Sequence, residues 1–121
     1  MEKKETDLIK ATYQQLTEYF AGKRKSFDIP IKLKGTEFQQ QVWSALQTIP
    51  YGDVWSYKRL AETVGSPKGY RAVGMANNRN PISIIVPCHR VLGIDGKLVG
   101  YAGGIDKKRK LLEMEQENRE R

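Results

Sequence analysis

Apolar side chains recur three and four positions apart in several stretches of the chain, which is the spacing of amphipathic helices. In residues 7–21 this pattern predicts a first helix, and Gly22 follows it as a stop signal. A basic connector with alternating apolar positions, residues 23–35, leads to a second helix predicted over residues 36–48. The pattern thus indicates helices rather than a sheet in this part of the chain.

Two shorter helices follow, separated by a turn that contains glycine. Ser56 is a good N-cap for a helix over residues 57–64, and Gly65 is placed to end it in the left-handed conformation. Ser66 is expected to cap the next helix, with Pro67 at its first position. Two short helices joined in this way form a helix-turn-helix, in which the second would be the recognition helix. An ordinary αα-hairpin without a binding function would show the same pattern.

The remaining pattern predicts a small hairpin and a last helix. Residues 91–100 are typical of a hairpin that turns on Asp95 and Gly96. Asp106 is expected to cap a final helix that runs through Met114. The predicted fold class is mainly α with a small β-hairpin, a winged-helix-like DNA-binding domain that contains a helix-turn-helix.

The composition fits one small intracellular domain. The chain has 121 residues, of which 39% are hydrophobic, enough for a core. Its single cysteine excludes an internal disulfide and fits a reducing compartment, so we expect a cytoplasmic protein. One cysteine and one histidine are too few ligands for a structural zinc site. The charged first residues argue against a signal peptide, and no run reaches the roughly 20 apolar residues of a membrane span.

Positive charge is concentrated in the middle of the chain. The formal net charge is +7, and Glu62 is the only acid between residues 56 and 90. The bases of that stretch are Lys58, Arg59, Lys68, Arg71, Arg79 and Arg90. This distribution predicts a nucleic-acid-binding face, with a solvated basic surface that has no partner as the alternative.

The only cysteine stands next to the only histidine, behind an apolar run. A thiol is a good nucleophile only as the thiolate, which a neighbouring base can generate. Cys88 and His89 are therefore candidates for a nucleophile and its base. A lone cysteine is more often a small buried hydrophobe, and on this pair alone that interpretation stays open.

Together with the motifs around this pair, the sequence resembles the O6-alkylguanine-DNA alkyltransferases. The strongest match is Ile-Val-Pro-Cys-His-Arg-Val at residues 85–91, which is similar to the active-site motif of that family. Further similar motifs, in the family's order, are Ser56-Tyr57, Arg71-Ala72-Val73-Gly74, Asn80-Pro81 and the stretch from Tyr101 to Gly104. The resemblance implies a DNA-binding and catalytic domain at residues 35–121, preceded by a helix and connector at residues 1–34.

The resemblance also implies a reaction. The protein would flip O6-alkylguanine out of duplex DNA and transfer the alkyl group irreversibly to its own cysteine in a single turnover. Cys88 matches the acceptor, His89 the base that reaches the thiol through a water, and Glu115 the carboxylate that orients the imidazole. Asn80 matches the hinge residue before the cysteine, and Tyr57 a residue that helps to rotate the nucleotide and donates to the departing guanine. The family needs no metal and no cofactor.

The same resemblance assigns residues to DNA and to the base pocket. Arg71 matches an arginine that enters the duplex and fills the gap left by the flipped base. The recognition helix is expected in the minor groove, where its small residues fit. Further DNA contacts are expected at Ser56, Lys68, Gly69, Ala72, Gly74 and Arg90, and the base pocket at Tyr101, Ala102, Gly103 and Gly104. The implied partner is double-stranded DNA containing O6-alkylguanine, bound by a monomer, with cooperative binding left open.

The chain departs from the family pattern, and two other functions remain open. Members usually carry an N-terminal domain, often with an RNase-H-like fold, whereas about 34 residues precede Gly35 here. Ser83 replaces a proline of many relatives and Ala102 a serine of some, which bears on the alkyl groups that fit. A non-catalytic lesion sensor of the alkyltransferase-like type is disfavoured by Cys88, because those proteins typically replace the nucleophile. A small transcriptional regulator would leave Cys88 and His89 unexplained.

Overall fold

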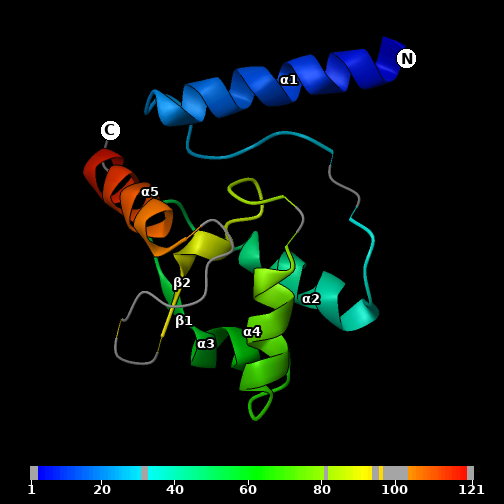
Figure 1. Cartoon of the computed structure of the whole chain (residues 1–121), viewed down its shortest axis with the longest axis vertical. Helices are drawn as coiled ribbons and strands as arrows, with labels where there is room; N and C mark the ends of the chain where they lie inside the picture. Colours follow the sequence, from blue (N-terminus) through cyan, green and yellow to red (C-terminus); the bar gives the residue numbers. More distant parts are fainter. Residues whose placement is uncertain (1–2, 31–32, 81, 94–95, 97–103, 120–121) are drawn as a thin grey trace. The chain divides into compact units, whose positions relative to one another are not determined.

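The structure is a computed structural model that describes residues 3–30, 33–80, 82–93, 96 and 104–119 (Figure 1). The chain divides into two compact units, Met1–Lys32 and Leu33–Arg121. In the described part of the chain, none of the helices has the length and hydropathy of a membrane span.

The first unit is one helix with a connector folded back along it. Helix α1, Lys3–Phe20, ends near Gly22, whose φ of 76° lets the amide of Lys23 bond back to the helix at 2.9 Å. The buried ring of Tyr19 packs against Phe27, with ring centroids 5.5 Å apart. Aromatic packing thus holds the connector against its own helix.

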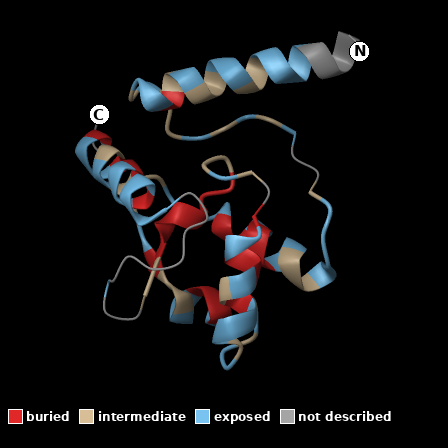
Figure 2. Ribbon diagram, in the orientation of Figure 1, coloured by how far each residue is buried: buried red, intermediate tan, exposed pale blue. Residues whose placement is uncertain are grey.

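Three helices build the core of the second unit. Helix α2, Glu37–Leu46, begins with a capping box, in which the side chains of Thr36 and Gln39 accept from each other's backbone amides at 3.0 Å. Helices α3, Tyr57–Thr63, and α4, Tyr70–Asn78, pack against α2 and against each other. Buried residues gather where these helices meet (Figure 2). The core side chains that they supply are Val42, Trp43, Ala45, Leu46, Leu60, Ala61, Val73 and Ala76.

The predicted helix-turn-helix has a second helix that begins later than expected. Ser56 caps α3 as predicted, because its hydroxyl accepts a backbone amide of the first turn at 3.0 Å. The prediction that Ser66 and Pro67 start the next helix is wrong. The Ser66 carbonyl instead accepts the Gly69 amide at 2.9 Å, which closes a tight turn, and α4 starts after it. Gly69 is the N-cap of α4 and makes no side-chain cap bond.

The sheet joins two segments that are far apart in the sequence. Strands β1, Trp55–Ser56, and β2, Val91–Leu92, pair in parallel, with Trp55 opposite Val91. Parallel neighbours need a long crossover, which α3 and α4 supply. The prediction of a mainly helical fold with a small sheet is confirmed. Of the predicted hairpin, residues 94–95 and 97–100 lie outside the described residues.

The last helix, α5, Ile105–Asn118, covers the short 3-10 turn η1, Cys88–Arg90. Asp106 was expected as its N-cap, and this is wrong: the Gly104 carbonyl accepts the first helical bond, from the Lys108 amide at 3.1 Å. Asp106 lies inside the first turn, where a carboxylate is favoured by the helix dipole. The buried residues of α5 are three and four positions apart and form one face: Lys108, Leu111, Glu115 and Asn118.

Candidate active site

The predicted nucleophile lies in the buried turn η1, and Asn80 braces the segment before it. The Asn80 side chain donates to the Val86 carbonyl at 2.7 Å and accepts from the Ile82 amide at 3.0 Å. The Cys88 amide donates to that same Val86 carbonyl oxygen at 2.8 Å. Asn80 therefore fixes the loop that carries Cys88. Within this loop Ile84 has a φ of 77°, a strained conformation for a β-branched residue.

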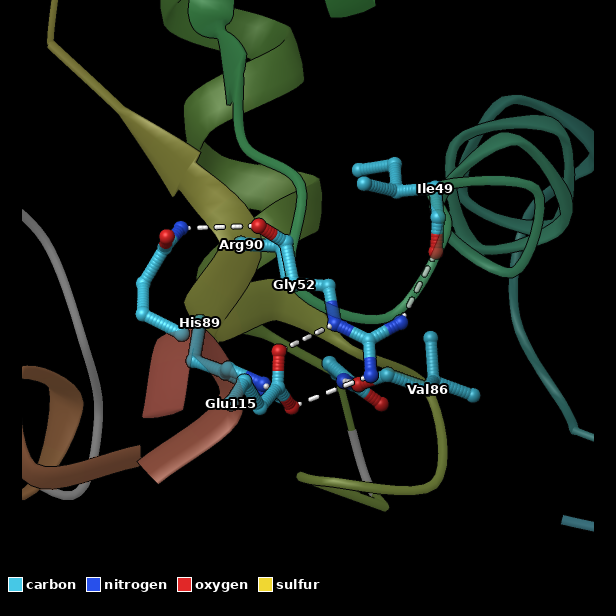
Figure 3. A network of polar contacts seen from close by, with 8 residues as sticks. Ile49, Gly52, Val86, His89, Arg90 and Glu115 are labelled. Atoms are coloured by element: carbon cyan, nitrogen blue, oxygen red, sulfur yellow. Dashed lines mark hydrogen bonds and ion pairs between the residues drawn. The ribbon is translucent and has the colours of Figure 1, made fainter. Parts of the chain in front are cut away.

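The imidazole of His89 is paired with the carboxylate of Glu115 (Figure 3). His89 Nε2 and Glu115 Oε2 are 2.7 Å apart, and both residues are fully buried. Burial alone would raise the pKa of Glu115, but hydrogen bonds from His89 and Arg90 outweigh it and lower the pKa to about 2. An ionised carboxylate can only accept, so Nε2 carries the hydrogen and Nδ1 is the basic nitrogen of the neutral ring. Among the described residues, the buried Nδ1 has no hydrogen-bond partner.

The pKa of His89 is lowered from its usual value, chiefly by burial. The positive charges of Arg90 and Lys108 lower it further, while the hydrogen bond and the charge of Glu115 oppose the shift. The ring is therefore held as a neutral base in the resting protein.

Arg90 does not belong to the surface, which corrects its expected role as a DNA contact. Its side chain is 7% exposed, and its Nε and Nη2 donate to the two oxygens of Glu115 at 2.8 and 3.0 Å. Its Nη1 donates to the Ile49 carbonyl at 2.8 Å (Figure 3), and its guanidinium lies 5.5 Å from the ring of Tyr51. Each guanidinium nitrogen donates inside the protein, and the buried side chain is not presented to a phosphate.

The thiol of Cys88 is only 4% exposed, and burial raises its pKa. Hydrogen bonds from Asn80 and Ser83 and the charge of Lys108 oppose part of this shift. A thiol whose pKa is raised is protonated at neutral pH, so it needs a base before it can react.

Lys108 is a part of this site that we did not predict from the sequence. It is completely buried, and burial lowers its pKa to about 8, while the negative charge of Cys88 acts in the opposite direction. Its spacing of three and seven positions from Leu111 and Glu115 was the available signal, because it places all three on the inner face of α5. Within the basic run of residues 107–110, only this lysine is buried.

Tyr57 closes another side of the site. Its half-buried hydroxyl accepts from the Asn77 side chain at 3.2 Å. Burial raises the pKa of Tyr57, the hydrogen bond with Asn77 opposes this, and the negative charge of Cys88 raises the pKa further, so the hydroxyl stays protonated at neutral pH. Asn77, buried on α4, is a second residue that the sequence did not single out.

The residues expected at DNA lie mainly on the outer face of α4 and the turn before it. Lys68, Arg71 and Ala72 are exposed, and Gly69 and Gly74 are half-buried. Ser56 lies apart from them at the start of α3, where its hydroxyl accepts the capping bond. Of the expected base pocket, Tyr101, Ala102 and Gly103 lie outside the described residues, and Gly104 is the exposed N-cap of α5 with a φ of 101°.

Comparison with known families gives a match over most of the second unit, Leu33–Arg121. A family model described as the DNA binding domain of 6-O-methylguanine DNA methyltransferase matches residues 37–117. The chain belongs to this family. The model of the ribonuclease-like domain of the 6-O-methylguanine DNA methyltransferases matches residues 2–33, which contain α1 and its connector.

Relatives and solved structures agree with the membership of this methyltransferase family. A methylated-DNA–protein-cysteine methyltransferase of Methanosarcina barkeri is 57% identical over 105 residues, which cover 87% of this chain and 66% of the relative. That of Mycobacterium tuberculosis is 59% identical over 101 residues, 84% of this chain and 61% of the relative. The chain thus matches 61–66% of the length of these relatives.

Two solved complexes are similar in structure. The crystal structure of Mycobacterium tuberculosis OGT in complex with DNA has a TM-score of 0.88 and 55% identity, covering 90% of this chain and 68% of that chain. The structure of S. pombe Atl1 in complex with damaged DNA containing O6-carboxymethylguanine has a TM-score of 0.59 and 34% identity, covering 69% and 79% of the two chains.

Proposed function

We propose that this protein repairs DNA by moving the alkyl group of an O6-alkylguanine to Cys88, once per molecule. The observation that carries the proposal is the buried row of Cys88, His89 and Glu115, with His89 Nδ1 as the basic nitrogen. This is the arrangement of a nucleophile, a base and an orienting carboxylate, with sulfur as the nucleophile. The methylated-DNA–protein-cysteine methyltransferase name of its relatives supports the same reaction.

The proposed transfer balances without a cofactor. The thiol proton of Cys88 passes to His89 Nδ1, directly or through one water, and the carboxylate of Glu115 stabilises the imidazolium. The thiolate then attacks the alkyl carbon, so that a sulfur–carbon bond forms while the bond from that carbon to guanine O6 breaks. The electron pair stays on the guanine, which takes a proton from the hydroxyl of Tyr57. His89 returns its proton to Tyr57, and the products are a thioether and unmodified guanine.

The proposed partner is duplex DNA, bound in the minor groove by α4 of a monomer in the cytoplasm. The exposed Lys68 and Arg71, beside the small residues Ala72 and Gly74, support this orientation. Arg71 would fill the gap left by the flipped base, because unstacking costs a few kcal/mol. The two similar proteins solved with DNA, one of them with damaged DNA containing O6-carboxymethylguanine, support a lesion in DNA as the target. Residues 35–121 would then form the domain that binds DNA and performs the transfer, after the helix and connector of residues 1–34.

The test is the intact mass of the protein after incubation with duplex DNA that carries one O6-methylguanine. We expect a gain of one methylene, mapped to the peptide that contains Cys88, and no gain with undamaged DNA. Cys88→Ala should abolish the gain while DNA binding survives. An unchanged mass of the native protein would contradict the proposal.

A lesion sensor without transfer activity is the second candidate, favoured by the likeness to Atl1 bound to damaged DNA. The two candidates differ in what Cys88 does. A sensor would bind O6-methylguanine duplex more tightly than undamaged duplex, would show no mass gain, and would keep that preference in Cys88→Ala.

A further inference from the structure

The buried arginine of the active-site turn has no role in the reaction described above. We propose that Arg90 is a positioning residue that clamps Glu115 and thereby keeps the imidazole of His89 neutral, with Nδ1 free to accept the thiol proton. The proposal rests on the proposed function, since it concerns the base of that same site.

The contacts of Arg90 are those of a clamp. Its two bonds to Glu115, at 2.8 and 3.0 Å, engage both carboxylate oxygens, and a fork of this kind fixes the plane of a carboxylate. Oε2 of that carboxylate is also the atom that His89 Nε2 meets at 2.7 Å. A third bond, at 2.8 Å, ties the guanidinium to the Ile49 carbonyl in the loop after α2. Arg90 therefore fixes the position of the Glu115 carboxylate, which in turn fixes the orientation of the His89 imidazole.

The charges around His89 explain why a cation is needed there. Among the described residues, the charged groups that act on the ring are Glu115 and Lys108 from α5 and Arg90 from its own turn, in which Cys88 is the preceding residue. A buried carboxylate next to an imidazole favours uptake of a proton by the pair, because a full negative charge is costly in the protein interior. Arg90 neutralises that charge through two hydrogen bonds, so the pair needs no additional proton at neutral pH.

Loss of the guanidinium would have a defined effect on the base. The Glu115–His89 pair would then bind one more proton at neutral pH, and this proton would occupy Nδ1. A ring that is already protonated there cannot accept the proton of Cys88. Transfer would then require a pH high enough to remove the additional proton first.

The single histidine and single cysteine of the chain make the test direct. We would label histidine with ¹⁵N and follow the two ring nitrogens from pH 5 to pH 9 in the native protein, Arg90→Met and Arg90→Lys. The matched control is Arg109→Met, which removes an exposed arginine of α5 whose ion pair with Asp106 is long, at 3.4 Å. Single-turnover transfer from O6-methylguanine duplex is measured over the same pH range.

In the native protein and the control we expect a neutral ring at pH 7, with the hydrogen on Nε2. In Arg90→Met the ring should titrate about one pH unit higher or more, and at pH 6 transfer should be about tenfold slower, since one unit corresponds to a factor of ten. The difference in rate should shrink toward pH 9. Arg90→Lys keeps the charge but not the fork, so its ring titration should lie closer to that of the native protein.

A purely structural role for Arg90 would slow transfer by the same factor at every pH and leave the ring titration unchanged, which would overturn the proposal. If Arg90→Met does not fold, Arg90→Gln, which also removes the charge, takes its place with the same expected shift of the ring titration. A native ring that is protonated at pH 7, or that carries its hydrogen on Nδ1, also overturns it. The ¹⁵N chemical shifts of the His89 ring are measured without DNA. They therefore test the role of Arg90 even if the protein proves to have no transfer activity. They also separate His89 from Lys108, whose pKa of about 8 affects the rate in the same range.

Discussion

At the scale of single residues, the site places four ionisable side chains besides the thiol of Cys88 in the interior of a small domain. His89, Lys108 and Glu115 are fully buried, and Arg90 nearly so. Charges in such positions persist only when they are paired and hydrogen-bonded, because desolvation alone costs several kcal/mol for each. The same pairing that makes His89 a base is therefore also a pH-dependent contribution to the stability of the fold.

Acid should remove this contribution in two steps. The pKa of His89 is lowered in the folded protein, so its contribution is lost as the pH falls below the usual 6.5. The pKa of Glu115 is lowered from 4.5 to about 2, so its contribution is present above pH 4.5 and is lost between 4.5 and 2. The free energy of unfolding in urea, measured from pH 7 to pH 2, should show both losses.

The contribution of Glu115 to stability can be measured as the difference in the free energy of unfolding between the native protein and Glu115→Gln. At pH 7 the variant should be less stable by about 3–5 kcal/mol, since it leaves buried cations without their counter-charge. The gap from the native protein should narrow between pH 4.5 and 2, as the native carboxylate takes up its proton. Glu117→Gln, on the exposed side of the same helix, is the control and should change stability by less than about 0.5 kcal/mol. An equal effect of the two substitutions would contradict this account of Glu115.

The sequence singled out Cys88, His89 and Glu115 as candidates, and the structure pairs two of them, but the sequence did not indicate the environment of the cations around them. Arg90 was assigned to DNA because a basic stretch of sequence does not distinguish a phosphate contact from a buried clamp. Lys108 stands among exposed bases, and only the spacing of its helix face distinguishes it. Both depend on how α5 packs on η1, a contact between residues about 20 or more positions apart that no local pattern encodes.

At the scale of elements, local signals predicted the start of α3 but not those of α4 and α5. The cap at Ser56 was correct because its hydroxyl and the first turn of α3 form one local unit. The cap at Ser66 was wrong because its carbonyl is used in a tight turn to Gly69. The parallel pairing of β1 with β2 was not predicted, because it joins segments separated by two helices.

The two serines give a matched test of the helix-turn-helix. Ser56→Ala should lower the free energy of unfolding by about 1 kcal/mol, because an amide of the first turn of α3 loses its acceptor. Ser66→Ala should change it by less than about 0.5 kcal/mol, since its hydroxyl caps no helix. Urea unfolding of both variants at pH 7 measures the difference. If Ser66→Ala lowers the free energy of unfolding as much as Ser56→Ala does, Ser66 caps a helix and α4 begins earlier than in this structure.

At the scale of the whole molecule, a net charge of +7 gives DNA binding a strong dependence on salt. Individual bases contribute to this dependence only where they neutralise a phosphate. Of the six bases between residues 56 and 90, five are exposed, and only Arg90 is buried and hydrogen-bonded within the protein. The net charge therefore overstates the number of bases that a DNA phosphate can reach, because it includes the buried Arg90.

Lys68→Ala should reduce the slope of log affinity against log salt by about one, with affinity lowered for damaged and undamaged duplex alike. Arg90→Met removes the same charge from the interior and should leave the slope unchanged. Fluorescence anisotropy titrations between 50 and 200 mM salt would measure both slopes. Equal slopes for the two variants would place Lys68 away from the DNA.

The proposed nucleophile and base, Cys88 and His89, lie on one short turn, but the carboxylate paired with His89 comes from α5, 26 positions further along the chain. The imidazole proposed to accept the thiol proton therefore gains the carboxylate that orients it only when the last helix has docked. A chain still emerging from the ribosome, or one in which α5 has frayed, contains Cys88 but lacks the pairing of His89 with Glu115. Reactivity is in this way coupled to completed folding, and an early loss of α5 protection in hydrogen exchange should coincide with loss of transfer.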